Sequence, residues 1–249
     1  MHLIKLSIIT IGTLTLLACS DEQTESSYIQ TEGIWANIKV QSDGVQSRVV
    51  TELNVSGSSG NNVVLSPQDT LVVTAGGQTK ILQKDLDFFD VDYQGYFEVT
   101  AGDSLFTIAL NRQKQTDAAH STVALPASFT IHSPLNTDVF KLNQNIGIDW
   151  DASAANQLIA LDLASSCTNN TGGTITQPIR LNIADDGQYT VLLSELAMFK
   201  NLEVDLSKNC TFNISLTREN QGEIDPNLKN NSHIKATQYR RVRDIVIDI

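Results

Sequence analysis

The residues whose types and spacing could support chemistry are mainly acidic. The densest cluster of carboxylates is a run of four closely spaced aspartates, Asp85, Asp87, Asp90 and Asp92. Hard cations such as Ca²⁺ need several oxygen ligands from one or two loops. The spacing does not fit the EF-hand loop, whose turn requires a glycine. The alternative is a solvated loop whose aromatic residues, Phe88 and Phe89, pack below it, and we expect no metal site.

A second carboxylate pair, Asp149 and Asp151, flanks Trp150. Two carboxylates on either side of a sugar are the machinery of glycoside hydrolases. An envelope enzyme that acts on glycans through acidic residues is therefore the alternative function for this chain. Paired carboxylates also arise by chance, so we expect no catalytic residue here.

Histidine and nucleophile motifs do not indicate catalysis either. Beyond His2, the histidines are His120, His132 and His233, and none forms the His-x-x-x-His spacing of zinc sites. The run Gly57-Ser58-Ser59-Gly60 differs from the Gly-x-Ser-x-Gly nucleophile elbow. We also find no glycine-rich loop that would cradle a phosphate. The sequence thus predicts neither a metal ion nor a cofactor.

An apolar N-terminal segment ends at Cys19. Residues 1–5 carry one cation, Lys5, residues 6–17 carry no charge, and the residues after Cys19 are polar. This order is typical of a secretory signal peptide, and the apolar part is too short to span a bilayer. The run Leu16-Leu17-Ala18-Cys19 resembles the lipobox of bacterial lipoproteins, whose cysteine is acylated and becomes the mature N-terminus.

The lipoprotein resemblance implies a location. Residues 1–18 are the signal peptide, and Cys19 carries the fatty acids, palmitate among them, that anchor the protein to a membrane. In that family an aspartate directly after the cysteine retains the protein in the inner membrane. Ser20 therefore favours the outer membrane, with the periplasmic or surface face left open. Residues 19–31, polar and without apolar periodicity, are expected to be a flexible tether.

Two cysteines remain once Cys19 is assigned to the lipid. In an exported, oxidising compartment the pair Cys167 and Cys210 indicates one disulfide. The alternatives are a metal site, which placed histidines would have to complete, or two free thiols in the core.

The chain is acidic, with 28 acidic against 17 basic residues and a net charge of −11. This balance argues against a nucleic-acid partner. Against it stands a basic cluster, Arg240, Arg241 and Arg243. Such a cluster could receive an acidic partner, but we favour an exposed face of a terminal strand, where cations discourage edge pairing.

Period-two alternation of apolar and polar residues dominates from Ile34 onward. The clearest strand begins at Cys210, with Phe212, Ile214 and Leu216 predicted to point inward. Glycine-containing turns predict two hairpins, one around residues 76–78 and one around residues 101–104. Half a dozen such strands before residue 122, without a long helical pattern, predict an all-β chain that forms a sandwich or a barrel.

The two halves are expected to be tandem immunoglobulin-like β-sandwich domains. The first covers residues 32–122 and the second residues 128–249, with Pro126 interrupting strand pairing between them. In the second half, the core residue Trp150 and the corner Asp185-Asp186-Gly187-Gln188-Tyr189 resemble the immunoglobulin-like modules of bacterial surface proteins. That resemblance implies a buried Trp150 and a Tyr189 hydroxyl bonded to nearby backbone.

These features together predict a lipid-anchored envelope lipoprotein that acts as a non-catalytic binding or structural module. Its expected partners are the membrane, through the lipid, and an envelope protein or glycan. Because loops carry binding more often than sheet faces, the expected site is the segment 165–177, which a disulfide at Cys167 would fasten.

Overall fold

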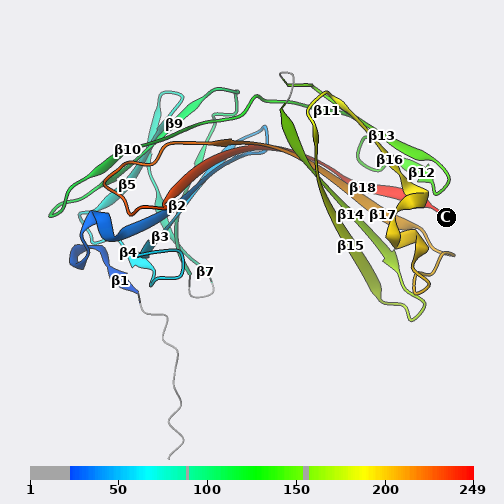
Figure 1. The fold of residues 1–249 in the computed structure, drawn as a ribbon, viewed down its shortest axis with the longest axis horizontal. Helices are drawn as coiled ribbons and strands as arrows, with labels where there is room; N and C mark the ends of the chain where they lie inside the picture. Colours follow the sequence, from blue (N-terminus) through cyan, green and yellow to red (C-terminus); the bar gives the residue numbers. More distant parts are fainter. Residues whose placement is uncertain (1–22, 88–89, 154–156) are drawn as a thin grey trace, which may run out of the picture.

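The alternation of the sequence becomes the architecture of the protein in a computed structural model. It describes residues 23–87, 90–153 and 157–249. The described chain is all-β apart from short 3₁₀ turns, and its strands form two sandwich lobes joined into an arch (Figure 1). No helix among the described residues is long and apolar enough to cross a membrane.

The first lobe contains two facing sheets. One has the strand order β10-β9-β5-β6, and the other contributes β2, β3, β8 and β7 to a long sheet. The bounds of these strands are β2 Ile34–Ser42, β3 Ser47–Val55, β5 Thr70–Ala75, β6 Gln78–Ile81, β7 Gln83–Asp87, β8 Asp90–Phe97, β9 Leu105–Asn111 and β10 Ala118–Ala124. A short parallel pair joins β1 Thr24–Glu25 to β4 Val63–Val64.

The second lobe also pairs two sheets. The smaller has the order β11-β13-β16, from β11 Ile131–Ser133, β13 Asn145–Trp150 and β16 Gln188–Leu192. The larger is formed by β12 Val139–Lys141, β14 Leu158–Thr168, β15 Thr174–Ala184, β17 Cys210–Gln221 and β18 His233–Asp248. The 3₁₀ turns are η1 Ser26–Tyr28, η2 Thr31–Gly33, η3 Leu193–Glu195 and η4 Ala197–Lys200.

One sheet runs through both lobes, in the order β15-β14-β17-β18-β2-β3-β8-β7. Its continuity depends on β18, whose first part pairs in parallel with β2 and whose last residues pair with β12. Ile234 and Ala236 of β18 lie in the core of the first lobe, whereas Val242 and Ile245 lie in the core of the second. The C-terminal strand is thus shared between the lobes.

This sharing bears on the predicted division into residues 32–122 and 128–249. That the two blocks are separate domains stays a prediction. The structure nevertheless places part of the second block in the first lobe, where Leu228 and Ile234 pack in the core. In addition, Thr122 and Glu223 form a backbone bridge. The physical reason is that β3 covers only one edge of β2, and β18 pairs with the backbone groups on its other edge.

The two predicted hairpins have different outcomes. The turn at residues 76–78 joins β5 and β6 as expected, and Gly76 and Gly77 adopt the positive φ values of 54° and 76° that the turn requires. The second prediction is wrong. The segment around Gly102 connects β8 to β9, which lie in different sheets, so it crosses the sandwich instead of closing a hairpin.

The predicted flexible tether, residues 19–31, is wrong for the part that the structure describes. Ser26 is fully buried, and its hydroxyl donates to Asp69 Oδ2 at 2.6 Å. Arg112 donates to the same carboxylate oxygen at 2.8 Å and to the carbonyls of Ser26 and Ile29 at 2.7 and 3.0 Å. These hydrogen bonds, from residues far along the chain, hold the segment in place although it has no apolar periodicity.

The hydrogen bonds around Asp69 also set its charge state. Burial by itself raises the pKa of this carboxyl. The hydrogen bonds from Ser26 and the Gln113 amide, together with Arg112, outweigh burial and hold the pKa below its ordinary value of 3.8. Asp69 is therefore a charged partner for Arg112 at neutral pH. Residues 19–22, including Cys19, lie outside the described residues.

Candidate ligand-binding surface

A groove lies on the larger sheet of the second lobe, on the face that points away from that lobe's core. Arg180, Asp162, Ser215 and Arg241 stand opposite one another in one row across β15, β14, β17 and β18. Neighbouring strands are about 4.8 Å apart, so the two arginines stand at opposite ends of the row. Between them the middle strands carry short side chains, which leaves a hollow of about 480 Å³.

The floor and walls of this groove follow from residue size. Ala164, Asn213 and Ser215 line its middle, and Pro178 lines the side formed by β15. In Figure 1 this sheet lies on the side of the second lobe that faces the first lobe, while β11, β13 and β16 lie on the outer side. The groove therefore opens toward the inside of the arch.

A second hollow, of about 470 Å³, lies on the other side of β18. It shares Arg241 and Arg243 with the groove and is otherwise lined mainly by Tyr239, Arg240 and residues between Thr130 and Asn136. This part of β18, between its pairing with β2 and its pairing with β12, has no strand partner on that side among the described residues. Arg241 and Arg243 therefore form a ridge between two hollows, which we call the arginine ridge.

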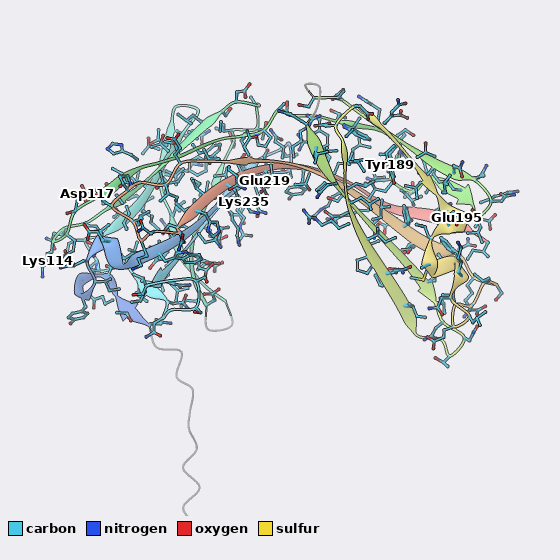
Figure 2. All side chains as sticks on the ribbon, in the orientation of Figure 1. Lys114, Asp117, Tyr189, Glu195, Glu219 and Lys235 are labelled. Carbon is cyan, nitrogen blue, oxygen red and sulfur yellow. A yellow bond between two sulfur atoms is a disulfide. The ribbon has the colours of Figure 1, made fainter. Side chains whose placement is uncertain are left out.

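The arginine ridge has no carboxylate partner within ion-pair distance among the described residues. The Arg241 guanidinium lies 4.7 Å from the centre of the Tyr239 ring, and Arg243 makes no ion pair. Elsewhere on these strands the cation Lys235 pairs with Glu219 at 2.9 Å, under the crown of the arch (Figure 2). The ridge is thus a local excess of positive charge in an acidic protein.

Arg240, the third member of the predicted basic cluster, serves a different purpose. Its guanidinium lies 5.2 Å from the centre of the Phe129 ring and donates to the backbone carbonyl of Tyr239 at 2.7 Å. Burial lowers the pKa of Arg240, against the attraction of Asp43. Successive residues of a strand face opposite sides, so Arg240 packs at the junction of the lobes while Arg241 and Arg243 face solvent.

A β-bulge fixes the position of the ridge on β18. The pairing of β17 with β18 shifts between Phe212 and Ile214, and Asp244 takes a φ of 58°. Asn213 accepts a hydrogen bond from the Asp244 amide at 2.9 Å. The extra residue lets Val242 and Ile245 both point into the core, and it follows directly after the exposed Arg243.

The disulfide between Cys167 and Cys210 is confirmed. It joins the ends of β14 and β17, with 2.02 Å between the sulfurs. These two strands form the floor of the groove, so the bond covalently links the strands beneath it. The predicted binding loop, residues 165–177, is mostly strand: only residues 169–173 lie between β14 and β15. The sheet face beside this segment, not the loop itself, forms the groove.

The predicted carboxylate cluster comes together in part. Asp85 of β7 lies opposite Asp92 of β8, which in turn lies opposite Glu52 of β3. Burial, followed by the charges of Asp90 and Glu52, raises the pKa of Asp92. No group of side chains that could hold a metal ion occurs among the described residues. The structure does not describe Phe88, Phe89 or the side chain of Asp87.

In the pair Asp149 and Asp151, the Asp151 carboxylate has partners of its own at the surface. His132 bonds Asp151 Oδ1 at 2.7 Å, and the Thr130 amide donates to Oδ2 at 2.8 Å. The bond from His132 lowers the pKa of Asp151. The side chains of both His132 and Asp151 are at least half exposed. This arrangement ties β11 to the end of β13 at the surface.

Trp150 and Tyr189 differ in how they meet the immunoglobulin-like expectation. Trp150 is buried, and its ring nitrogen donates to Asp185 Oδ1 at 2.8 Å. Tyr189 lies on β16 and is half-buried; among the described residues its hydroxyl makes no hydrogen bond to nearby backbone. The tryptophan part of the expectation is confirmed, and the tyrosine part is wrong.

Arg218 is a buried residue that the sequence reasoning did not single out. It forms a two-point ion pair with Asp185, at 2.7 and 2.8 Å. It also donates to the carbonyls of Ala127 and Asp151, at 3.1 and 2.5 Å. The signal was present in the sequence, because Arg218 continues the inward positions of β17 after Leu216. A charge in an inward position requires a buried partner.

The chain is similar to several solved structures, but it matches no known protein family. No protein-family model and no curated protein matches the chain. Among solved structures, it is similar to the titin domains Z1Z2 in complex with telethonin, at 10% identity and a TM-score of 0.23, over 87% of this chain and 98% of that one. It is also similar to fibronectin(III)-like modules of Clostridium thermocellum CbhA, at 10% identity and a TM-score of 0.22, over 82% and 94% of the chains.

A third similar structure is the Yersinia pseudotuberculosis adhesin InvE, at 13% identity and a TM-score of 0.21. The match covers 84% of this chain and 58% of the adhesin. Likenesses at this level carry no argument about function.

Proposed function

We propose that this protein is a lipid-anchored lipoprotein of the bacterial outer membrane that acts as a non-catalytic binding module. Its binding surface is the groove bordered by Arg180 and the arginine ridge. One observation carries the proposal: two exposed arginines stand side by side between two hollows, and within the described part of the chain neither has a carboxylate at ion-pair distance.

The electrostatics of the ridge favour an anionic partner. In a chain of net charge −11, an uncompensated positive ridge concentrates the attraction for anions at one place. Arginine suits this task because its planar guanidinium binds a carboxylate at two points. Asp162, 3.5 Å from Arg180, neutralises the opposite wall and confines the attraction to the ridge.

The sheet beneath the groove is suited to hold these side chains in fixed positions. The floor strands β14 and β17 are paired along seven residue positions and closed by the Cys167–Cys210 bond. Sites built on paired strands keep their geometry better than sites on loops. A rigid groove loses little conformational entropy when a ligand binds.

The anchor sets where the groove works. Five residue steps separate Cys19 from Thr24, the first residue of β1. At no more than ~3.6 Å per residue, they reach about 18 Å. A lipid on Cys19 would therefore hold the first lobe close to the membrane. The expected partner is an envelope protein or glycan.

The anchor has a direct test. Cells fed a labelled fatty acid should label the protein, and Cys19→Ser should abolish the labelling and leave residues 1–18 uncleaved. Ser20→Ala, which changes the neighbouring residue and spares the cysteine, should label normally. A mature protein that begins elsewhere and carries no fatty acid would refute the anchor.

The binding surface is tested in intact cells by cross-linking. Arg241→Gln with Arg243→Gln should reduce the yield of cross-linked adducts about tenfold or more, because each charge-assisted contact contributes roughly 1.5–3 kcal/mol. The matched control is Lys114→Gln with Lys141→Gln, which removes two exposed cations away from the groove; Lys114 lies at the far tip of the first lobe (Figure 2). Equal loss of adducts in both variants would contradict the proposed surface.

A further inference from the structure

We infer that the arginine ridge recognises an acidic peptide segment in an extended conformation, with carboxylates at alternate positions. The inference rests on the proposed function, because it names the ligand of the same groove. The spacing of the two arginines, the neutral opposite wall and the short side chains of the floor carry it.

The spacing of the ridge matches an extended peptide. Arg241 and Arg243 are two residues apart on one strand and face the same side. Arg241 pairs with Ser215 and Val242 with Ile214, and Arg243 follows as the first of the two residues that lie opposite Asn213 in the bulge. Both arginines line the same two hollows. Side chains two apart on a strand are separated by about 6.6 Å. A peptide that lies extended beside β18 presents its own alternate side chains at the same repeat, so two acidic residues can meet both arginines in register.

The charge of the groove favours a ligand that is acidic along one edge only. The two guanidiniums of the ridge form no ion pair with any residue that the structure describes, whereas Arg180 on the opposite wall has Asp162 at 3.5 Å. Asp162 lines the groove and repels a ligand that is anionic on both sides. An extended peptide with acidic residues at every second position has one acidic and one neutral edge, which fits both walls.

The floor allows close approach of such a peptide. Ala164, Ser215 and Asn213 project little from the sheet, and Pro178 adds an apolar surface on the β15 side. The hollow of about 480 Å³ is of the size that ligand sites have. Tyr239 precedes Arg241 by two residues on β18; the guanidinium lies 4.7 Å from the centre of its ring, and this contact helps to hold the arginine in place.

The inference is tested by fluorescence anisotropy with the purified full chain in detergent. The probe is a labelled peptide of four Thr-Glu repeats. Two peptides serve as controls: four Thr-Gln repeats, and a block of four Thr followed by four Glu, which has the same composition but not the alternation. We expect the alternating acidic peptide to bind at least tenfold more tightly than the glutamine peptide and severalfold more tightly than the block peptide.

Variants locate the binding. Arg241→Gln with Arg243→Gln should weaken binding of the alternating peptide by at least tenfold, and Lys114→Gln with Lys141→Gln should leave it unchanged. Unchanged thermal unfolding midpoints will show that the variants are folded. Equal binding of the alternating and block peptides, or equal weakening by both variants, would overturn the inference.

Three further outcomes separate this inference from the proposed function. Loss of adducts in cells without peptide binding in solution would overturn the peptide as ligand and leave the groove as the binding surface. Tight binding of an oligomer of uronic acids, with no binding of the peptide, would overturn it in favour of an acidic glycan. Ridge-dependent peptide binding without any effect of the ridge on adducts would support the inference and refute the function in the envelope.

Discussion

Removal of the C-terminal strand should abolish folding of both lobes. A chain that ends at Gln221 lacks β18, whose Ile234 packs in the first core and whose Val242, Ile245 and Ile247 pack in the second. Each fully buried side chain of this size contributes about 1.5–3 kcal/mol. Four of them sum to roughly 6–12 kcal/mol, as large as the entire stability of a typical domain. Far-ultraviolet circular dichroism and denaturant titration should show no cooperative unfolding.

The control for this truncation is removal of Ile249 alone. That residue follows the last residue of β18 and is 37% exposed, so its loss should leave the unfolding midpoint almost unchanged. A chain ending at Gln221 that unfolds cooperatively, with a native-like spectrum, would show that β18 does not hold the lobes together.

The same strand determines the fate of the predicted domains when they are produced separately. Residues 23–127 lack the parallel partner of β2 and should not fold alone. Residues 128–249 retain the second core but expose Leu228 and Ile234, so they should fold with reduced solubility. Independent folding of both fragments would establish the two-domain prediction in its simple form.

Breaking the buried ion pair at the junction should have the second large effect. Arg218→Met should reduce the free energy of unfolding by about 3–5 kcal/mol, because it leaves the Asp185 carboxylate buried without its charged partner. The side chains of Arg218 and Asp185 are only 4% and 1% exposed. The same substitution removes the hydrogen bond to the Ala127 carbonyl, so amide hydrogens at residues 127–130 should exchange faster.

The matched control is Arg180→Met. Arg180 pairs with Asp162 at 3.5 Å with its side chain 68% exposed, and exposed pairs contribute about 0–1 kcal/mol. Chemical denaturation of both variants, compared at equal slope, measures the difference. Similar losses of stability in the two variants would mean that the Arg218–Asp185 pair does not stabilise the fold more than an exposed ion pair does.

Local patterns in the sequence were sufficient for several features. The alternation from Cys210 to Leu216 predicted the inward face of β17, because successive side chains of a strand point to opposite sides whatever the rest of the chain does. The glycines at residues 76 and 77 predicted a hairpin, because they relieve the strain of positive φ. The cysteine pair predicted a disulfide because an exported protein lies in an oxidising compartment and because an even number of cysteines remained after Cys19. Each of these depends on a few residues or on composition.

Partners far apart in the chain were decided only by the tertiary structure. The sequence around Gly102 has the form of a hairpin, yet its strands belong to different sheets because β9 pairs with β5 instead. The polar segment before Thr31 has no pattern of its own and is held by Arg112 and Asp69, from distant parts of the chain. Pairing energy depends on which strand is free at a given edge, and no local period records that.

The binding surface shows the same division. The sequence by itself determined that Arg240, Arg241 and Arg243 lie close together and that the last strand is amphipathic. Only the tertiary structure decided that Arg240 packs on Phe129 while Arg241 and Arg243 border a groove. The groove exists because Ala164 and Ser215, which are 51 residues apart in sequence, come together on adjacent strands that bear short side chains. Charge and alternation are properties of single segments, whereas a concave surface is a property of the strands that meet in one sheet.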